Sequence, residues 1–305
     1  MVKAKPLKNF IMLKLLLRSF RIYSIPYAVI VCLTGLFLTV PSPDYYTIVI
    51  FMVASTFCWI GGMLYYDVTH AWEDKIKKPY RLIPLFPHLT KKIILLSSTL
   101  IFAASLLIFI IDLLKGAILL GLGLTLMFLY NIFKKMVFLY AKYVVRGFAG
   151  VFLVLFAPFV FSTINLKLAL VGATVFLLDL AGNLAGDIRD WEKDAVFYNL
   201  KHWNLKKAKS IHLLLSSLGV ISLFVTAVFS WSNPNLAPVI LLFLLLSYTI
   251  FRVKTNIIHR IFTLFKTALL TFFLAIYISS YLLMAVGFLL LPIVNYAYKF
   301  SHPEF

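Results

Sequence analysis

The fold is decided by a mostly apolar stretch that runs directly into a cluster of acids: LKLALVGATVFLLDLAGNLAG at residues 166–186, followed by DIRDWEKD at residues 187–194. A hydrocarbon core about 30 Å thick is crossed by about 20 helical residues, because each residue adds about 1.5 Å. The first stretch has that length. It therefore predicts a membrane-spanning helix that emerges into a charged connection.

The composition of the whole chain agrees with lipid as its main solvent. Of 305 residues, 62% are hydrophobic and only 13% are charged, whereas a soluble chain keeps about a quarter of its residues charged. The net charge of +18 could by itself suggest nucleic acid, but the basic residues are not gathered on one hydrated face. We therefore expect a membrane protein with no nucleic-acid partner.

Apolar stretches of spanning length recur along the chain. They predict nine crossings at residues 22–40, 47–66, 93–111, 113–130, 147–162, 166–186, 211–231, 236–251 and 261–282. Residues 283–296 are either a tenth crossing or the end of a long, tilted ninth. We expect an all-α polytopic bundle, with one transmembrane domain over residues 22–305 and a basic segment over residues 1–21 suited to lie on the membrane as an interfacial helix.

The basic residues indicate which side of the membrane each connection faces. All but three of the 29 Lys and Arg residues precede the first span or lie at alternate connections; the exceptions are Lys115, Lys167 and Lys299. The positive-inside rule assigns the basic side to the cytoplasm. The N-terminus and the two loops at residues 67–92 and 187–210 are therefore predicted to be cytoplasmic, next to the lipid headgroups.

Acidic residues are concentrated in two of these cytoplasmic loops, which hold seven of the 11 Asp and Glu residues. In the second loop, Asp187, Asp190 and Asp194 are spaced by three and four residues, so they share one face of a helix that continues out of the membrane. Asn183 and Asp179 extend the same stripe inward. Such clustering favours a site over loops that are merely solvated.

The first loop repeats this spacing with Asp67, His70 and Asp74. Four spans separate the two groups, so both emerge on the same side and resemble a parallel internal repeat of four-helix units. Carboxylates flanked by Lys and Arg beside an apolar interior suit Mg²⁺, which takes its remaining ligands from water and phosphate. The implied ligand is a diphosphate, and the alternative is a solvated charged face at each helix exit.

Two segments resemble the signatures of the UbiA superfamily of intramembrane prenyltransferases. The first is YDVTHAWED at residues 66–74 with KIKKPYRLIP at residues 75–84, similar to NDxxDxxxD followed by PxRPIP. The second is DIRDWEKD at residues 187–194, similar to DxxDxxxD. The family is a nine-helix bundle with both signatures on the cytoplasmic side, so the resemblance covers essentially the whole chain. Tyr66 stands where the family has Asn, and His70 where it has a metal-binding Asp.

The resemblance implies a Mg²⁺-dependent enzyme that transfers a polyprenyl group from an allylic prenyl diphosphate to an acceptor, either an aromatic quinone precursor or a glycerol-phosphate lipid precursor. The implied metal ligands are Asp190 and Asp194 with Asn183 and Asp187 for one ion, and Asp67 and Asp74 for the other. The implied substrate-binding residues are Arg81, Lys193 or Lys201 for the diphosphate, Tyr66 for the carbocation, and Asp179 for the acceptor pocket. Asp67, Asp190 and His70 are the candidate catalytic residues.

Three questions stay open at this point. The changes at Tyr66 and His70 indicate a rearranged metal site, fewer metals or altered chemistry, with His70 either a neutral filler or an acid–base group. Asp179 lines a pocket or is a buried, hydrogen-bonded residue. The alternative functions are a terpene cyclase, which would use the same ionisation without an acceptor, and a non-catalytic homologue or carrier.

Overall fold

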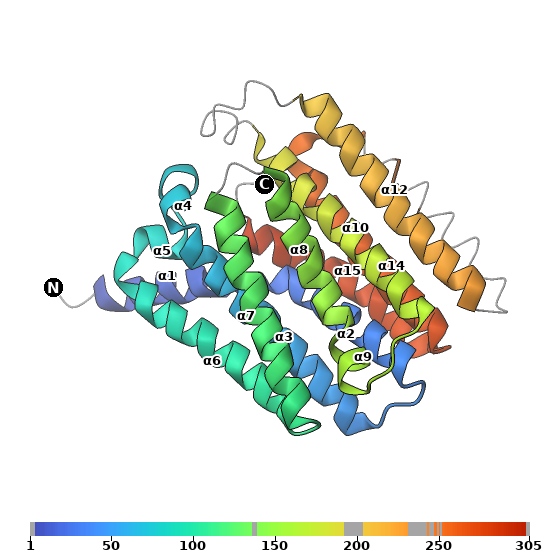
Figure 1. Ribbon diagram of the computed structural model, residues 1–305. Helices are drawn as coiled ribbons and strands as arrows, with labels where there is room; N and C mark the ends of the chain where they lie inside the picture. Colours follow the sequence, from blue (N-terminus) through green and yellow to red (C-terminus); the bar gives the residue numbers. More distant parts are fainter. Residues whose placement is uncertain are drawn as a thin grey trace.

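The computed structural model describes residues 4–135, 139–191, 204–230, 243, 247, 248, 250 and 252–302. Within these residues all regular structure is helical, and the helices form a bundle (Figure 1). Eight helical stretches in this part of the chain are long and apolar enough to cross a membrane. The protein is therefore an all-α, integral, multi-pass membrane protein, as predicted.

The helices follow the predicted spans in order. They are α1 (Ala4–Ser19), η1 (Ile22–Ser24), α2 (Ile25–Thr39), α3 (Tyr45–Thr69), α4 (Ala71–Lys77), α5 (Leu82–Leu85), η2 (Pro87–Leu89), α6 (Thr90–Phe109), α7 (Leu113–Lys135), α8 (Leu139–Val154), α9 (Phe156–Val160), α10 (Leu166–Arg189), α12 (Leu205–Ser230), α14 (Thr255–Tyr277) and α15 (Tyr281–Ser301). The predicted eighth span, residues 236–251, lies largely outside the described residues.

Several helices begin before the predicted apolar spans, as α8, α12 and α14 do, and two further differences have a local cause. The predicted fifth span is divided into α8 and α9 next to Pro158, which has no N–H to bond the carbonyl of Val154. After α14 the chain turns at Ser279, whose φ is 52°, and the Ser280 side chain then accepts a hydrogen bond from the Leu283 N–H. Because this turn and cap start α15 anew, the interpretation of residues 283–296 as the end of a long ninth helix was wrong.

The basic N-terminal segment forms α1, which runs at an angle to the long helices in Figure 1. Its Leu15 packs with Leu64, Leu82 and Ile83 in a small apolar cluster. Arg21, with φ at 50°, makes the turn between α1 and η1. The segment is thus fastened to α3 and α5 on the charged end of the bundle, while its place at the membrane surface stays a prediction.

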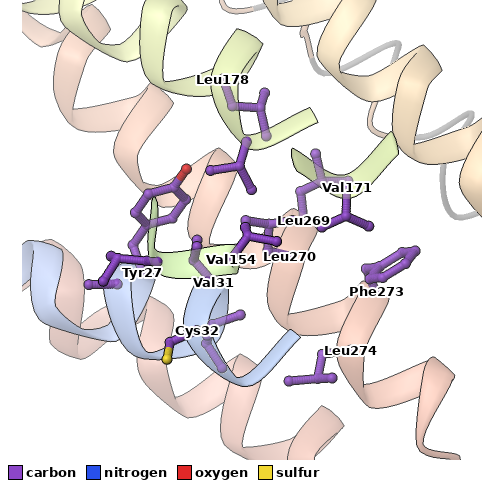
Figure 2. Close-up of a cluster of buried hydrophobic side chains, with 14 of the residues drawn as sticks. Tyr27, Val31, Cys32, Val154, Val171, Leu178, Leu269, Leu270, Phe273 and Leu274 are labelled. Carbon is purple, nitrogen blue, oxygen red and sulfur yellow. The ribbon is translucent and has the colours of Figure 1, made fainter. Parts of the chain in front are cut away.

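The main core lies where α2, α8, α10 and α14 meet (Figure 2). Val31, Val154, Val171 and Leu270 are completely or almost completely buried there. A Cβ at Gly35 would lie 2.0 Å from the Val154 carbonyl oxygen, so α2 and α8 approach as closely as a glycine permits. This packing fixes α8 and α10, two helices that carry the site.

The C-terminal ends of α3 and α10, where the two acidic motifs begin, have the same backbone capping. His70 caps α3 and Asp190 caps α10, each with its backbone N–H bonded to the carbonyl oxygen four residues earlier. α3 packs extensively on α6, and α10 packs extensively on α12. Lys78, which follows α4, reaches Asp190 at 2.7 Å, so both ends lie on the same side of the bundle.

Candidate functional site

A cavity of about 300 Å³ opens between the two helix ends. The lining becomes less polar with distance from these ends. Near the ends it includes Tyr66 of α3, Tyr130 of α7 and Arg146 of α8, and further along the same helices it includes Cys58, Gly123 and Phe152. Most of the charged lining residues belong to or adjoin the segments at the two helix ends, and one charged pair lies deeper. The described lining includes the cations Arg21, Lys78, Arg81, Arg146, Arg189 and Lys266 and the acids Asp179, Asp187 and Asp190. The cavity therefore suits an amphiphile with an anionic head and an apolar tail.

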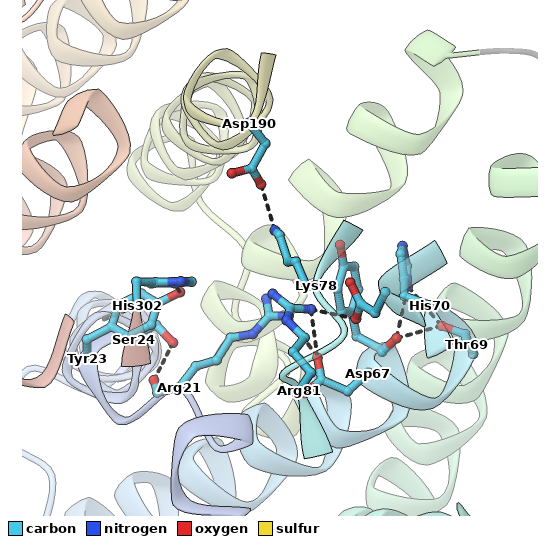
Figure 3. A network of polar contacts seen from close by, with 12 residues as sticks. Arg21, Tyr23, Ser24, Asp67, Thr69, His70, Lys78, Arg81, Asp190 and His302 are labelled. Carbon is cyan, nitrogen blue, oxygen red and sulfur yellow. Dashed lines mark hydrogen bonds and ion pairs between the residues drawn. The ribbon is translucent and has the colours of Figure 1, made fainter. Parts of the chain in front are cut away.

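The acids of the first motif are held by arginines (Figure 3). Arg21 Nη2 lies 3.0 Å from Asp67 Oδ1, and Arg81 Nη1 lies 2.7 Å from Asp74 Oδ2 and 3.7 Å from Asp67 Oδ1. Burial raises the pKa of Asp74, although Arg81 opposes this effect. For Arg81, burial favours the neutral form, but Asp74 and Asp67 outweigh it and raise the pKa. Asp67 and Asp74 thus form ion pairs with the arginines, and they do not line the main cavity.

His70 and Tyr66 are stacked on each other, with ring centroids 3.7 Å apart. His70 Nδ1 lies 2.9 Å from the Tyr66 carbonyl oxygen, which can only accept, so Nδ1 carries the proton in the neutral ring. Nε2, 3.1 Å from the Tyr130 hydroxyl oxygen, then accepts. The structure places His70 behind the cavity wall, where it supports Tyr66, and does not bring it to the cavity.

Tyr66 itself lines the cavity and carries two arginines. The guanidinium carbon of Arg21 lies 4.5 Å from the ring centre, and that of Arg146 lies 4.6 Å from it. Arg146 also donates a hydrogen bond of 3.2 Å to Asn183 Oδ1. Cation–π contacts of this kind are favourable in desolvated surroundings. Arg146 therefore links the first motif to the stripe on α10.

The second motif is joined to the first by an ion pair. Asp190 accepts two hydrogen bonds of 2.8 Å from Arg189 and one of 2.7 Å from Lys78. Burial alone would raise the pKa of Asp190, but Arg189 and Lys78 together hold it well below its usual range. Burial and the neighbouring Arg81 lower the pKa of Lys78. Asp187 accepts a hydrogen bond from the Tyr143 hydroxyl.

Three predicted site residues, Asp194, Lys193 and Lys201, lie outside the described residues.

A second charged pair lies deeper in the cavity. Lys266 Nζ is 2.7 Å from Asp179 Oδ1 and 3.6 Å from the centre of the Tyr27 ring. A Cβ at Gly150 would lie 2.1 Å from Asp179 Oδ2, so this glycine makes room for the carboxylate. The sequence left open whether Asp179 lines a pocket or is a buried, hydrogen-bonded residue. In the structure it does both, because it lines the cavity and forms a buried ion pair with Lys266.

The sequence did not identify Arg21, Arg146, Arg189 and Lys266 as site residues. Arg21 and Arg146 were assigned only to the basic side of the membrane, and both are in fact directed into the cavity. Their positions in the sequence could have indicated a role in the site. Each of the four residues adjoins or lies within a predicted span, where an unpaired charge is costly. Lys266, inside the predicted ninth span, carried the clearest form of that signal.

The donor set in the described part of the chain does not fit Mg²⁺. No group of three or more His, Cys, Asp and Glu residues is arranged there to hold a metal ion. Asp67, Asp74 and Asp190 each face a cation at 3.0 Å or less. A metal would have to displace buried cations from their partners, which is costly, so no step is assigned to Mg²⁺ below.

Together, these features define a polytopic helical membrane protein whose cavity has a cationic mouth and an apolar interior. Solved structures with this architecture include a digeranylgeranylglyceryl phosphate synthase, with a TM-score of 0.60 and 17% identity over 88% of this chain and 98% of that chain. A UbiA homologue from Aeropyrum pernix K1 in its apo form matches with a TM-score of 0.61 and 14% identity over 88% of this chain and 96% of that chain.

A UbiA homologue from Archaeoglobus fulgidus bound to GPP and Mg²⁺ matches with a TM-score of 0.60 and 13% identity over 91% of this chain and 99% of that chain. No protein-family model matches the sequence, and a search of curated proteins finds no significant match. This protein therefore has the fold of the UbiA homologues.

Proposed function

We propose that this protein is a divergent member of the UbiA superfamily and transfers a prenyl group from an allylic prenyl diphosphate to an acceptor within the membrane. One observation carries this proposal: a single cavity joins both signature segments at a cationic mouth and continues between apolar walls. A diphosphate head fits the mouth and a prenyl tail fits the interior. The solved neighbours with the same fold support the proposal, because one of them binds GPP.

The side chains at the mouth suit the departure of diphosphate. Breaking the allylic carbon–oxygen bond leaves negative charge on the leaving group, and Lys78 and Arg81 present donors to the cavity where that charge develops. The carbocation needs a surface that stabilises it without reacting. Trp59 and Tyr65 supply aromatic rings to the lining of the same cavity, whereas the Tyr66 ring is already in contact with His70, Arg21 and Arg146. A prenyl tail that fills the apolar part of the cavity would exclude water from the cation.

The acceptor is proposed to be interfacial or lipid-soluble, either an aromatic quinone precursor or a glycerol-phosphate lipid precursor. The Asp179–Lys266 pair lines the cavity beyond the mouth, where it can bind a polar group of an acceptor. The cytoplasmic placement of the mouth is proposed from the distribution of basic residues.

The test uses purified full-length protein in lipid nanodiscs with radiolabelled allylic diphosphates of several chain lengths and a panel of both acceptor classes. We expect diphosphate release and a labelled lipophilic product only when an acceptor is present. Lys78→Met should lower the rate by about tenfold or more, because a charge-assisted hydrogen bond to the leaving group is lost. Arg260→Gln is the control, since Arg260 bonds Asn295 and does not line the cavity.

Omitting the acceptor separates the candidate functions. A cyclic hydrocarbon formed from the diphosphate alone would show a terpene cyclase and refute transfer to an acceptor. A complete lack of diphosphate release with every donor, in protein that remains folded, would refute the enzymatic proposal and favour a non-catalytic homologue or carrier.

A further inference from the structure

Two positions at which this chain departs from the UbiA signature form one physical unit. Tyr66 and His70 stand in place of Asn and Asp, and their rings are stacked at 3.7 Å with an angle of 20° between the planes. Tyr130 stacks on His70 and bonds its Nε2. The two substitutions thus place an aromatic platform where the signature has Asn and a metal-binding Asp; Tyr66 and Tyr130 line the cavity, and His70 is packed behind Tyr66.

Arginines lie against this platform. Arg21 and Arg146 lie within 4.6 Å of the Tyr66 ring centre, and all three of Arg21, Arg81 and Arg146 line the cavity. A guanidinium group has five N–H donors, and a carboxylate uses at most two of them in a bidentate pair. Arg21 and Arg81 bond carboxylates and Arg146 bonds the side-chain oxygen of Asn183, so donors remain on the three guanidinium groups for an anion in the cavity.

The carboxylates of the first motif lie behind these arginines. Asp67 bonds Arg21, and Asp74 bonds Arg81, at 3.0 and 2.7 Å. Among the described lining residues, cations outnumber carboxylates two to one, because Asp67 and Asp74 do not line the main cavity. A ligand in the cavity consequently meets more cationic than anionic side chains. The carboxylates hold the arginines in place and are not presented to a metal.

We propose that Arg21, Arg81 and Arg146 bind the diphosphate directly and that diphosphate binding by this protein requires no divalent cation. Asp67, Asp74, Tyr66 and His70 are positioning residues that orient these arginines. The inference rests on the proposed function, because an allylic diphosphate is taken as the anion. It goes further by stating how the charge of that anion is neutralised.

The experiment measures binding of a non-ionisable allylic thiolodiphosphate with the chain length of GPP to full-length protein in nanodiscs, with either excess EDTA or Mg²⁺ present. We expect the Kd in EDTA to lie within about threefold of the Kd in Mg²⁺. Arg146→Gln should weaken binding by about tenfold or more in both conditions, since hydrogen bonds to charged groups are lost. Arg146→Lys should recover part of that loss, because it keeps the charge without the planar fork.

A second variant tests the platform itself. The double substitution Tyr66→Asn with His70→Asp removes the stack and supplies oxygen ligands. We expect its affinity in EDTA to fall more than its affinity in Mg²⁺, so that binding acquires a metal dependence that the natural protein lacks. A purely structural role for Tyr66 and His70 would lower both affinities equally and would contradict their role as positioning residues. Arg260→Gln again serves as the control.

The outcomes separate this inference from the proposed function. Binding that disappears in EDTA and returns with Mg²⁺ would overturn the inference and leave the proposed function standing. Failure to bind the thiolodiphosphate in either condition would refute both. Equal binding in EDTA and Mg²⁺, lost on changing Arg146, supports both.

Discussion

The buried pair of Asp179 and Lys266 gives the sharpest test of how the helices around the cavity are held together. The pair joins α10 to α14 at 2.7 Å, and the two side chains are 7% and 13% exposed. Lys266→Met leaves Asp179 charged and unpaired beside Tyr27. Breaking a buried pair in this way costs about 3–5 kcal/mol, and we expect the lower end, about 3 kcal/mol, because water in the cavity can reach the carboxylate.

The assay is a double-mutant cycle on the free energy of unfolding, followed by tryptophan fluorescence in nanodiscs. Asp179→Asn combined with Lys266→Met removes both charges, so the double variant should be more stable than Lys266→Met alone. We expect a coupling energy of about 2 kcal/mol. Asp112 and Lys115 form the matched control pair, since they are 3.4 Å apart but considerably more exposed, and they should show no measurable coupling.

One result would refute this reasoning. A coupling energy below about 0.5 kcal/mol, which means a double variant about as unstable as the sum of the single variants, would show that the two residues do not stabilise the protein through each other.

Three further predictions follow from single features. Gly150→Ala should destabilise the protein by about 1–3 kcal/mol and displace Asp179, because its Cβ would lie 2.1 Å from Asp179 Oδ2; unchanged thermal stability and activity would contradict this. The pKa of Asp190 is held below its usual range, so its contribution to stability should be present at neutral pH and lost as pH falls below about 4. Asp190→Asn should remove that part of the acid dependence in unfolding measured against pH. Asp44→Cys should react with an impermeant thiol reagent added outside intact cells and Lys75→Cys should not, if the basic loops are cytoplasmic; the reverse pattern would overturn the assigned orientation.

The sequence predicted the helical class and most span positions, because the length and apolarity of each span are local properties. It did not predict where α14 ends. Residues 261–282 and 283–296 are continuous in apolarity, and the turn depends on Ser279 and on the capping side chain of Ser280. A single serine at a helix start is a weak signal inside a long apolar stretch.

The sequence predicted those parts of the site that depend on local properties of one helix. The spacing of the acids on α10 follows from helical periodicity, and the structure places Asp187 and Asp190 at the cavity. The partners of the acids could not be predicted, since Arg21 precedes α2 and Arg146 lies in α8, and only the packing of the bundle brings them to Tyr66. A pattern within one helix carries no information about cations that come from other helices.

The residues that cap the ends of α3 and α10 have the same backbone position but different side-chain partners. His70 and Asp190 have the same capping position, at the ends of α3 and α10. His70 bonds Tyr130 of α7, whereas Asp190 bonds Lys78, which follows α4. Asp190 is also bonded by Arg189, so Lys78 is the cation that it can release without becoming unpaired. An anion that binds Lys78 in place of Asp190 therefore leaves Lys78 with a partner of opposite charge and Asp190 with Arg189.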